Sequence, residues 1–163
     1  MASHTDWANG YLAQARADLA AASAPVHPSV RAMLMQMSFE KIAKAALLKS
    51  GQWSPTNAQT SHRGASHMMT LILRRRVLAK VGFERPVVEF VIKPMVDMLE
   101  SLHPANREAG PWLEYPWLTP EGNVATPCEE LPDLEIYGAR SNRAALLLRF
   151  AKHLVTNHDK IFS

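Results

Sequence analysis

The stretch from residue 36 to residue 51 constrains the fold of this chain more than any other. It consists mainly of Ala, Leu, Lys, Glu and Met, which are strong helix formers, and it ends in a glycine that suits a left-handed C-cap. Upstream, Pro28 suits a first helical turn. Phe39, Ile42 and Ala46 recur at three- and four-residue spacing, which predicts one buried face. We therefore predict a core helix that continues to Lys49.

Periodic apolar patterns elsewhere predict a bundle around this helix. The other predicted helices run from about Thr5 to Ser23, from Ser66 to Gly82, from Arg85 to Leu102, and onward from an N-cap at Ser141. Ser3 or Thr5 is expected to cap the first helix, and Pro94 to kink or restart the fourth. The polar segment 52–61 is predicted to be a loop. The fold prediction is a single all-α domain over residues 1–163, an up-and-down bundle of four to five helices.

A long proline-rich segment, from His103 to Asp133, precedes the last helix. It contains six of the eleven prolines and two of the four tryptophans. Such a composition is too apolar for a disordered linker, so we predict a long ordered loop packed on the bundle. Trp112, Tyr115 and Trp117 suit either stacking on a nucleobase or clamping the loop to the bundle, and we favour the clamp.

Composition limits the class of protein. A chain of 163 residues is long enough for one domain with a sizeable core. Its one cysteine, Cys128, excludes an internal disulfide and points to a reducing compartment. The polar start of the chain does not resemble a signal peptide, and no apolar run approaches membrane-spanning length. We predict a cytoplasmic protein without membrane contact, whose net charge of +3 permits nucleic-acid binding without requiring it.

Several motifs occur in the order found in one family of small helical domains. They are Ala15-x-x-Asp18-Leu19-x-x-Ala22, then Arg31, Gln36-x-x-Phe39-Glu40-Lys41-x-x-Lys44-Ala45 and Gly51, a helix led by His67 or less well by His62, and Glu114-Tyr115-Pro116-Trp117 followed by Gly122 and Pro127. In this order and spacing the chain resembles a HEPN domain (higher eukaryotes and prokaryotes nucleotide-binding). The resemblance covers most of the chain.

The resemblance implies a helical bundle that forms a homodimer. Some HEPN proteins are ribonucleases, often toxins paired with an antitoxin or a nucleotidyltransferase, and others have no known catalysis. Active members carry an Arg, four to six residues and then a His near the start of the last long helix. Here only three residues separate Arg149 from His153, and Arg63 from His67. The function prediction is therefore a non-catalytic binding protein for a nucleotide, an RNA or a protein partner.

Two alternatives remain open from the sequence. One is a metal-independent ribonuclease that uses Arg63 to hold a phosphate and His67 as acid and base. The other is a purely structural dimerisation module. The predicted ligand-binding residues are Arg63, His67, Tyr115 and Trp117, although an Arg and a His at this helix start are also typical of capping and packing. Arg74, Arg75 and Arg76 fan around a helix and are interpreted as solvated, with a diffuse basic surface as the alternative.

No cofactor is predicted, and neither is a metal. The seven histidines show no spacing typical of a metal site, and His62 with His67 would share an ion only with favourable local geometry. We also find neither a phosphate-cradling glycine loop nor a Ser-His-Asp arrangement.

Overall fold

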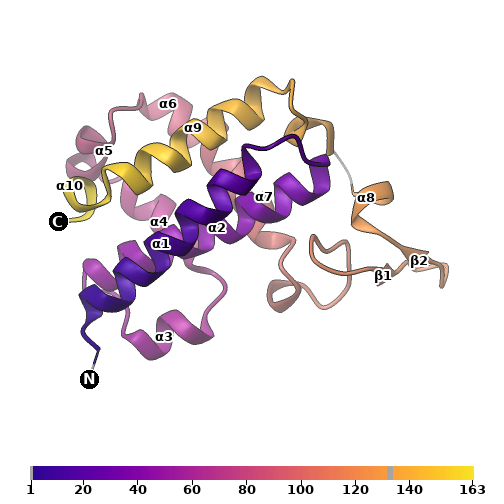
Figure 1. Cartoon of the computed structure of the whole chain (residues 1–163), viewed down its shortest axis with the longest axis horizontal. Helices are drawn as coiled ribbons and strands as arrows, with labels where there is room; N and C mark the ends of the chain where they lie inside the picture. The colour runs from indigo at the N-terminus through magenta and orange to yellow at the C-terminus, as the bar shows by residue number, and fades with distance from the viewer. Residues whose placement is uncertain (1, 132–133) are drawn as a thin grey trace.

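The computed structural model describes residues 2–131 and 134–163 (Figure 1). The predicted all-α class is confirmed, since the strands among these residues are only β1, Trp117–Leu118, and β2, Val124–Ala125. The longer helices are α1, His4–Ala22; α2, Pro28–Lys49; α4, Gly64–Ile72; α7, Lys93–Ser101; and α9, Asn142–Thr156. The shorter ones are α3, Pro55–Thr60; α5, Arg75–Val81; α6, Arg85–Val87; α8, Pro127–Glu130; and α10, His158–Phe162. None of the described helices combines the length and the apolar character that a membrane span requires.

The first two helices pack side by side along most of their length. Ser3 caps α1 in a capping box with Asp6, which confirms the first of the two predicted caps. The turn between α1 and α2 is held by the buried Arg31, whose guanidinium group donates to the backbone oxygens of Ala22, Ala24 and Tyr137. Because Tyr137 lies just before α9, one side chain joins the connection between α1 and α2 to the segment that leads into the last long helix.

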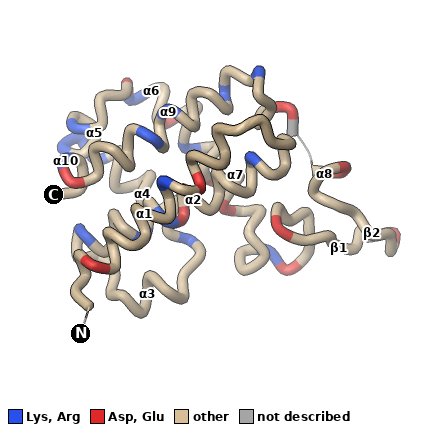
Figure 2. Tube along the Cα trace, in the orientation of Figure 1, with Lys and Arg blue, Asp and Glu red and all other residues tan. Residues whose placement is uncertain are grey.

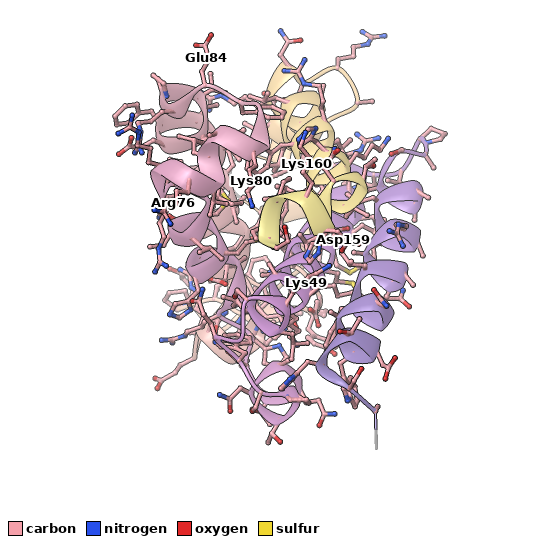
Figure 3. All side chains as sticks on the ribbon, turned by 90° about the vertical axis from the view of Figure 1, so that its left-hand side faces the viewer. Lys49, Arg76, Lys80, Glu84, Asp159 and Lys160 are labelled. Carbon is pink, nitrogen blue, oxygen red and sulfur yellow. The ribbon has the colours of Figure 1, made fainter. Side chains whose placement is uncertain are left out.

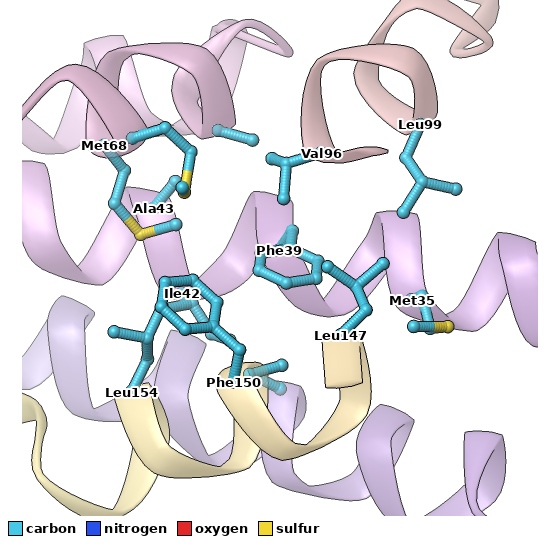
Figure 4. Packing of buried hydrophobic residues seen from close by; sticks show 14 of the residues in the cluster. Met35, Phe39, Ile42, Ala43, Met68, Val96, Leu99, Leu147, Phe150 and Leu154 are labelled. Carbon is cyan, nitrogen blue, oxygen red and sulfur yellow. The ribbon is translucent and has the colours of Figure 1, made fainter. Parts of the chain in front are cut away.

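The core lies around α2, as the sequence predicts (Figure 4). Phe39 and Ile42 of α2 are almost fully buried and face Phe150 and Leu154 of α9. On the other side of α2, Val96 and Leu99 of α7 and Met68 of α4 close the core. The Phe39 and Phe150 rings stack with centroids 6.4 Å apart. Burial of this apolar surface is the main source of stability in the bundle.

Two predictions about helix boundaries were wrong. The segment 52–61 contains α3, because Ser54 caps it and Pro55 occupies the first turn, where proline is favourable. The single helix predicted from Ser66 to Gly82 is two helices, since Arg74 adopts an extended backbone between α4 and α5. The backbone oxygen of Leu73, left without a helical partner by this break, accepts a hydrogen bond from Arg85 Nη2 at 2.8 Å.

The prediction of a kink or restart at Pro94 is confirmed. A π-helical turn, η1, covers Val88–Ile92 between α6 and α7. Proline lacks the N–H that a continuous α-helix would use, and a π-turn rearranges the backbone hydrogen bonds just before it.

The predicted proline-rich loop forms a projection that we call the arm, residues 104–131 (right side of Figure 1). It begins with a short 3₁₀ turn, Pro104–Asn106, and continues into the β1–β2 hairpin, in which Trp117 pairs with Ala125. Trp117 is buried against Gly110, where a Cβ atom would lie only 2.0 Å from Trp117 Cγ. The predicted end of the loop, at Asp133, lies outside the described residues.

Candidate functional site

The predicted pair Arg63 and His67 lies at the start of α4, but the two side chains have different partners. Arg63 Nε donates to Asn106 Oδ1 at 3.1 Å, at the base of the arm. His67 Nδ1 lies 2.9 Å from the backbone oxygen of Arg63, and its ring packs edge-on against Trp53. Both residues are exposed. In this structure the guanidinium group and the imidazole thus bond to different partners.

The two predicted aromatic ligand-binding residues of the arm, Tyr115 and Trp117, differ in their exposure to solvent. Tyr115 is 57% exposed and is free to contact a ligand, whereas Trp117 is 9% exposed and packs inside the arm against Gly110. Trp112 is half-buried, and its Nε1 donates to the backbone oxygen of Arg107. Trp117 is therefore not available as a stacking platform, and because its contact with Gly110 lies within the arm, a clamp of the loop on the bundle stays a prediction.

A different polar cluster forms where the arm leaves the bundle. Glu40 of α2 reaches two imidazoles, with its Oε1 3.2 Å from His62 Nδ1 and its Oε2 3.9 Å from His103 Nε2. The two imidazole rings stack with centroids 4.3 Å apart and planes inclined by 18°. Glu114 of the arm adds a second carboxylate, 3.6 Å from His103 Nε2. We call Glu40, His62, His103 and Glu114 the arm-base cluster.

Charged neighbours from the bundle surround this cluster. Lys44, buried one turn after Glu40, forms an ion pair with it at 2.6 Å and lies 5.6 Å from the ring centroid of Tyr11 in α1. Burial and the negative charge of Glu40 raise the pKa of Tyr11. Burial, followed by the neighbouring His62, lowers the pKa of His103, although Glu40 and Glu114 act in the opposite direction. His103 is therefore kept neutral in spite of its two carboxylate neighbours.

A cavity of about 10 Å³ lies beside the cluster and is lined in part by Gln36, Glu100 and the two histidines. Such a volume holds about one water molecule and no organic ligand. The buried Gln36 Oε1 has no hydrogen-bond partner among the described residues, and Gln36 Nε2 donates to the backbone oxygen of Leu99. The four cluster residues are half-buried, and the cavity beside them is too small for an organic ligand.

Among the described residues, only Glu40, His62 and His103 bring three ligand-type atoms within 4.8 Å of one another. Their orientation does not suit a metal ion. An imidazole binds a metal along the lone pair in its own plane, and in two nearly parallel stacked rings these directions do not converge. His103 Nδ1 also accepts the backbone N–H of Ala105, whereas a ligating histidine donates through its second nitrogen.

Little in the sequence points to the arm-base cluster. Its members come from α2, from the link between α3 and α4, from the residue just before the arm and from the arm, so no short spacing connects them. From the sequence, His62 was considered as a weaker helix start than His67 and as its partner in a metal site. A His-Pro dipeptide, at His103-Pro104, was the one available local signal, because a histidine before proline is well placed to cap a turn.

A second candidate surface is the end of the bundle formed by α5 and α10. Five exposed cations lie there, and we call them the basic end: Arg74, Arg75, Arg76, Lys80 and Lys160. Figure 2 shows the concentration of basic residues at this end, and Figure 3 shows Arg76, Lys80 and Lys160 on the same face. Lys80 Nζ donates to the backbone oxygen of Ser163, which fastens α5 to the end of α10.

Comparison of the chain with protein-family models, with curated proteins and with solved structures gave no match.

Proposed function

We propose that this chain is a HEPN-like, non-catalytic helical protein that binds RNA through the basic end. The proposal rests on one observation: the cations of the basic end have no carboxylate partner in the described part of the chain. None of Arg74, Arg75, Arg76, Lys80 and Lys160 lies within 4.0 Å of a side-chain carboxylate among the described residues. Unneutralised cations on one face attract the phosphates of a nucleic acid and release its counterions.

Several lysines elsewhere in the bundle are paired with carboxylates. Lys41 pairs with Asp18, Lys44 with Glu40, and Lys93 with Asp97. Even next to the basic end, Lys49 pairs with Asp159, and this partner lowers the pKa of the Asp159 carboxyl. Among the described residues, unpaired cations also occur outside this end, for example at Arg107, Arg140 and Arg143, but five of them gather around α5 and α10, which supports a binding role better than the small net charge of the chain does.

The kind of contact follows from the side chains present. Among the residues that the structure describes, the exposed large apolar ones are Val30, Phe90, Tyr115, Leu118 and Val124, and none of these belongs to α5 or α10. The basic end thus offers charge without a stacking platform, so we expect contacts to phosphates and little preference for sequence.

The non-catalytic part of the proposal is supported by the other polar groups. Arg63 and His67 have separate partners, as described above. The arm-base cluster has two stacked histidines, but Glu40, Glu100 and Glu114 lie next to them, and these carboxylates repel a phosphate. Acid–base chemistry on RNA also needs access for the scissile phosphate, which a cavity of about 10 Å³ does not provide.

The proposal is tested by fluorescence anisotropy with a labelled single-stranded RNA of about 20 nucleotides. If all five cations contact phosphates, the affinity falls about 100-fold between about 50 mM and 200 mM salt. Reversing Arg74, Arg75 and Arg76 together to Glu is expected to weaken binding at low salt by at least about tenfold.

The matched control reverses Arg107, Arg140 and Arg143 to Glu, three exposed arginines outside α5 and α10. It changes the net charge by the same amount and is expected to change the affinity by less than about threefold. Equal losses in the two triple variants would show that net charge alone acts and would overturn the basic end as the site. Cleavage of the RNA that disappears on Arg63→Ala or His67→Ala would contradict the non-catalytic assignment.

The homodimer and a protein partner such as an antitoxin or a nucleotidyltransferase stay predictions of the resemblance. Light scattering at high protein concentration tests the dimer directly, and a monomer there would contradict it.

A further inference from the structure

Two turns of this chain are capped in the same way by a histidine that precedes a proline. His27 comes before Pro28 at the start of α2, and its Nδ1 accepts the backbone N–H of Ser29 at 3.3 Å. His103 comes before Pro104 at the start of the arm, and its Nδ1 accepts the backbone N–H of Ala105 at 3.1 Å. In both, the residue before the proline is extended, with ψ of 145° and 134° respectively, as proline requires.

Such a cap works only with a neutral imidazole. The ring nitrogen that accepts a backbone N–H must carry a lone pair, so the one proton of the neutral ring is on the other nitrogen. In His103 this places the proton on Nε2, which faces the carboxylates of Glu40 and Glu114. A second proton goes to Nδ1, where it points at the N–H of Ala105 and replaces a hydrogen bond by a contact between two donors.

The surroundings of the two caps differ. His27 is exposed and has no carboxylate within 4.0 Å among the described residues, whereas the His103 side chain is only 13% exposed. The titratable or charged groups that face His103 are Glu40 and Lys44 from α2, His62 from the link between α3 and α4, and Glu114 from the arm. Glu100 of α7 lines the same cavity.

The turn that His103 caps carries the contacts by which the arm is joined to the bundle. Asn106, at the end of this turn, donates through Nδ2 to the backbone oxygens of His62 and Glu100 and accepts from Arg63 Nε. A further bond runs from the backbone N–H of Leu113 to the oxygen of Leu102. Loss of the His103 cap therefore loosens the segment that positions Asn106.

From this geometry we infer that His103 is a proton-operated latch, which holds the base of the arm on the bundle when neutral and releases it when protonated. The released segment is the arm from Pro104 onward, while the α1–α2–α9 core stays packed. The inference does not involve the basic end and is independent of RNA binding.

The direction of the pH effect follows from the charge state that the docked arm prefers. Docking lowers the pKa of His103 below its ordinary value of 6.5, mainly through burial and then through His62. The released arm consequently binds the proton more tightly than the docked arm does. Docking is fully stable above the ordinary pKa of a histidine and weakens as the pH falls below it.

The latch is tested by amide hydrogen exchange, read by mass spectrometry at about pH 7.5 and about pH 5 and corrected for the intrinsic exchange rates. Peptides of α2 serve as the internal reference for the bundle. In the wild-type protein we expect the protection of residues 105–113 to fall more than that of α2 on acidification, because docking lowers the pKa of His103.

Three variants test whether protonation of His103 causes the loss of protection at the base of the arm. His103→Asn keeps an acceptor for the Ala105 N–H but does not titrate, so protection of the arm base is expected to persist at both pH values. His103→Ala removes the cap and is expected to expose the arm base already at neutral pH. His27→Asn makes the same exchange at the other His-Pro cap and is expected to respond to acid as the wild type does.

Two outcomes would overturn the latch: arm-base protection in the wild type that follows α2 at both pH values, or an equal acid response in His103→Asn and the wild type. A direct readout that does not depend on the variants is the ¹⁵N spectrum of the imidazoles. It is expected to show His103 with its proton on Nε2 at neutral pH, and a proton on Nδ1 instead would also contradict the inference.

Discussion

The helical bundle and the arm of this protein are held together in different ways. In the bundle, long helices bury apolar faces against one another, so that Phe39, Ile42 and Phe150 contact several elements each. In the arm, a two-residue hairpin, one tryptophan over a glycine and a few hydrogen bonds at the base provide the order. Bundle stability is thus spread over many contacts, whereas the arm adds a few buried apolar residues, among them Leu113, Ala125 and Leu131, to the hydrogen bonds at its base.

This difference separates two kinds of defect. Damage to a spread-out core lowers the free energy of unfolding of the whole domain. Damage to the arm is expected to open the arm alone, because local unfolding follows regions with few buried contacts. Substitutions can therefore test whether a residue stabilises the whole domain or only the arm.

The largest effect is expected for Phe150→Ala in α9. Phe150 is fully buried, stacks with Phe39 and contacts Phe83 edge-on with centroids 5.1 Å apart. Its truncation leaves a cavity in the core and should cost about 3–5 kcal/mol of unfolding free energy, measured by urea denaturation. The matched control is Phe90→Ala, since Phe90 is 73% exposed and should cost little. Similar losses in both variants would contradict the description of the core.

A smaller effect, about 3 kcal/mol, is expected when His158 is titrated. His158 of α10 is buried, and burial followed by the charge of Lys49 lowers its pKa from 6.5 to about 4. The unfolded chain therefore binds this proton more tightly. The stability of the bundle should fall as the pH drops from 6.5 to about 4 and should not fall further on this account below that range.

Urea denaturation across this pH range checks the titration of His158. His158→Leu removes the titrating group and should flatten that part of the pH profile. His67→Leu makes the same replacement at an exposed histidine and should leave the profile as in the wild type. If His158→Leu retains the full acid sensitivity, another group is responsible. This bundle effect is distinct from the latch, because it lowers the protection of α2 as well as that of the arm.

Gly110→Ala should affect the arm by about 1–3 kcal/mol without unfolding the bundle. A Cβ atom at this position would lie 2.0 Å from Trp117 Cγ, so the indole must move out of its buried place. We expect stronger quenching of tryptophan fluorescence by acrylamide and a nearly unchanged urea midpoint. A loss of the whole cooperative transition would show that the arm and the bundle unfold as one unit.

The same substitution in the bundle should have the opposite sign and the smallest size. Gly10 is an exposed position in the interior of α1, and nothing lies within 4 Å of a Cβ atom built there. Gly10→Ala should therefore stabilise the protein by about 0.5–1 kcal/mol, because alanine has the higher helix propensity. Urea denaturation measures this gain, and a loss of stability would mean that α1 needs the glycine.

Helices that pack through one apolar stripe could be predicted from the sequence. The Pro28–Lys49 helix begins and ends where its proline, its apolar spacing and Gly51 place it, and Gly51 has the expected positive φ of 69°. The break at Arg74 could not be predicted, because the apolar period of Met69, Leu73 and Val77 continues across it. The backbone oxygen of Leu73 at this break bonds instead to Arg85, a residue that this local pattern does not include.

The arm-base cluster could not be predicted from the sequence for a related reason. Glu40, His62 and His103 come together only after α2, α4 and α7 have packed, and residues that far apart leave no periodic trace. Arg63 and His67 are the reverse case, since their helical spacing predicts proximity while Asn106 draws the guanidinium group to the arm. Spacing along one helix determines which side chains share a face, but tertiary partners determine where their polar ends go.

Arg31 has a consequence for the order of folding. Its bonds to Ala22 and Ala24 span nine and seven residues, whereas its bond to the backbone oxygen of Tyr137 spans 106 residues. The two short-range bonds close small loops and can form as soon as α1 and α2 meet, while the third must wait for a large loop to close. The same guanidinium group thus first closes a helical hairpin and later receives the segment that leads into the last helices, so the early hairpin prepares the docking site for the end of the chain.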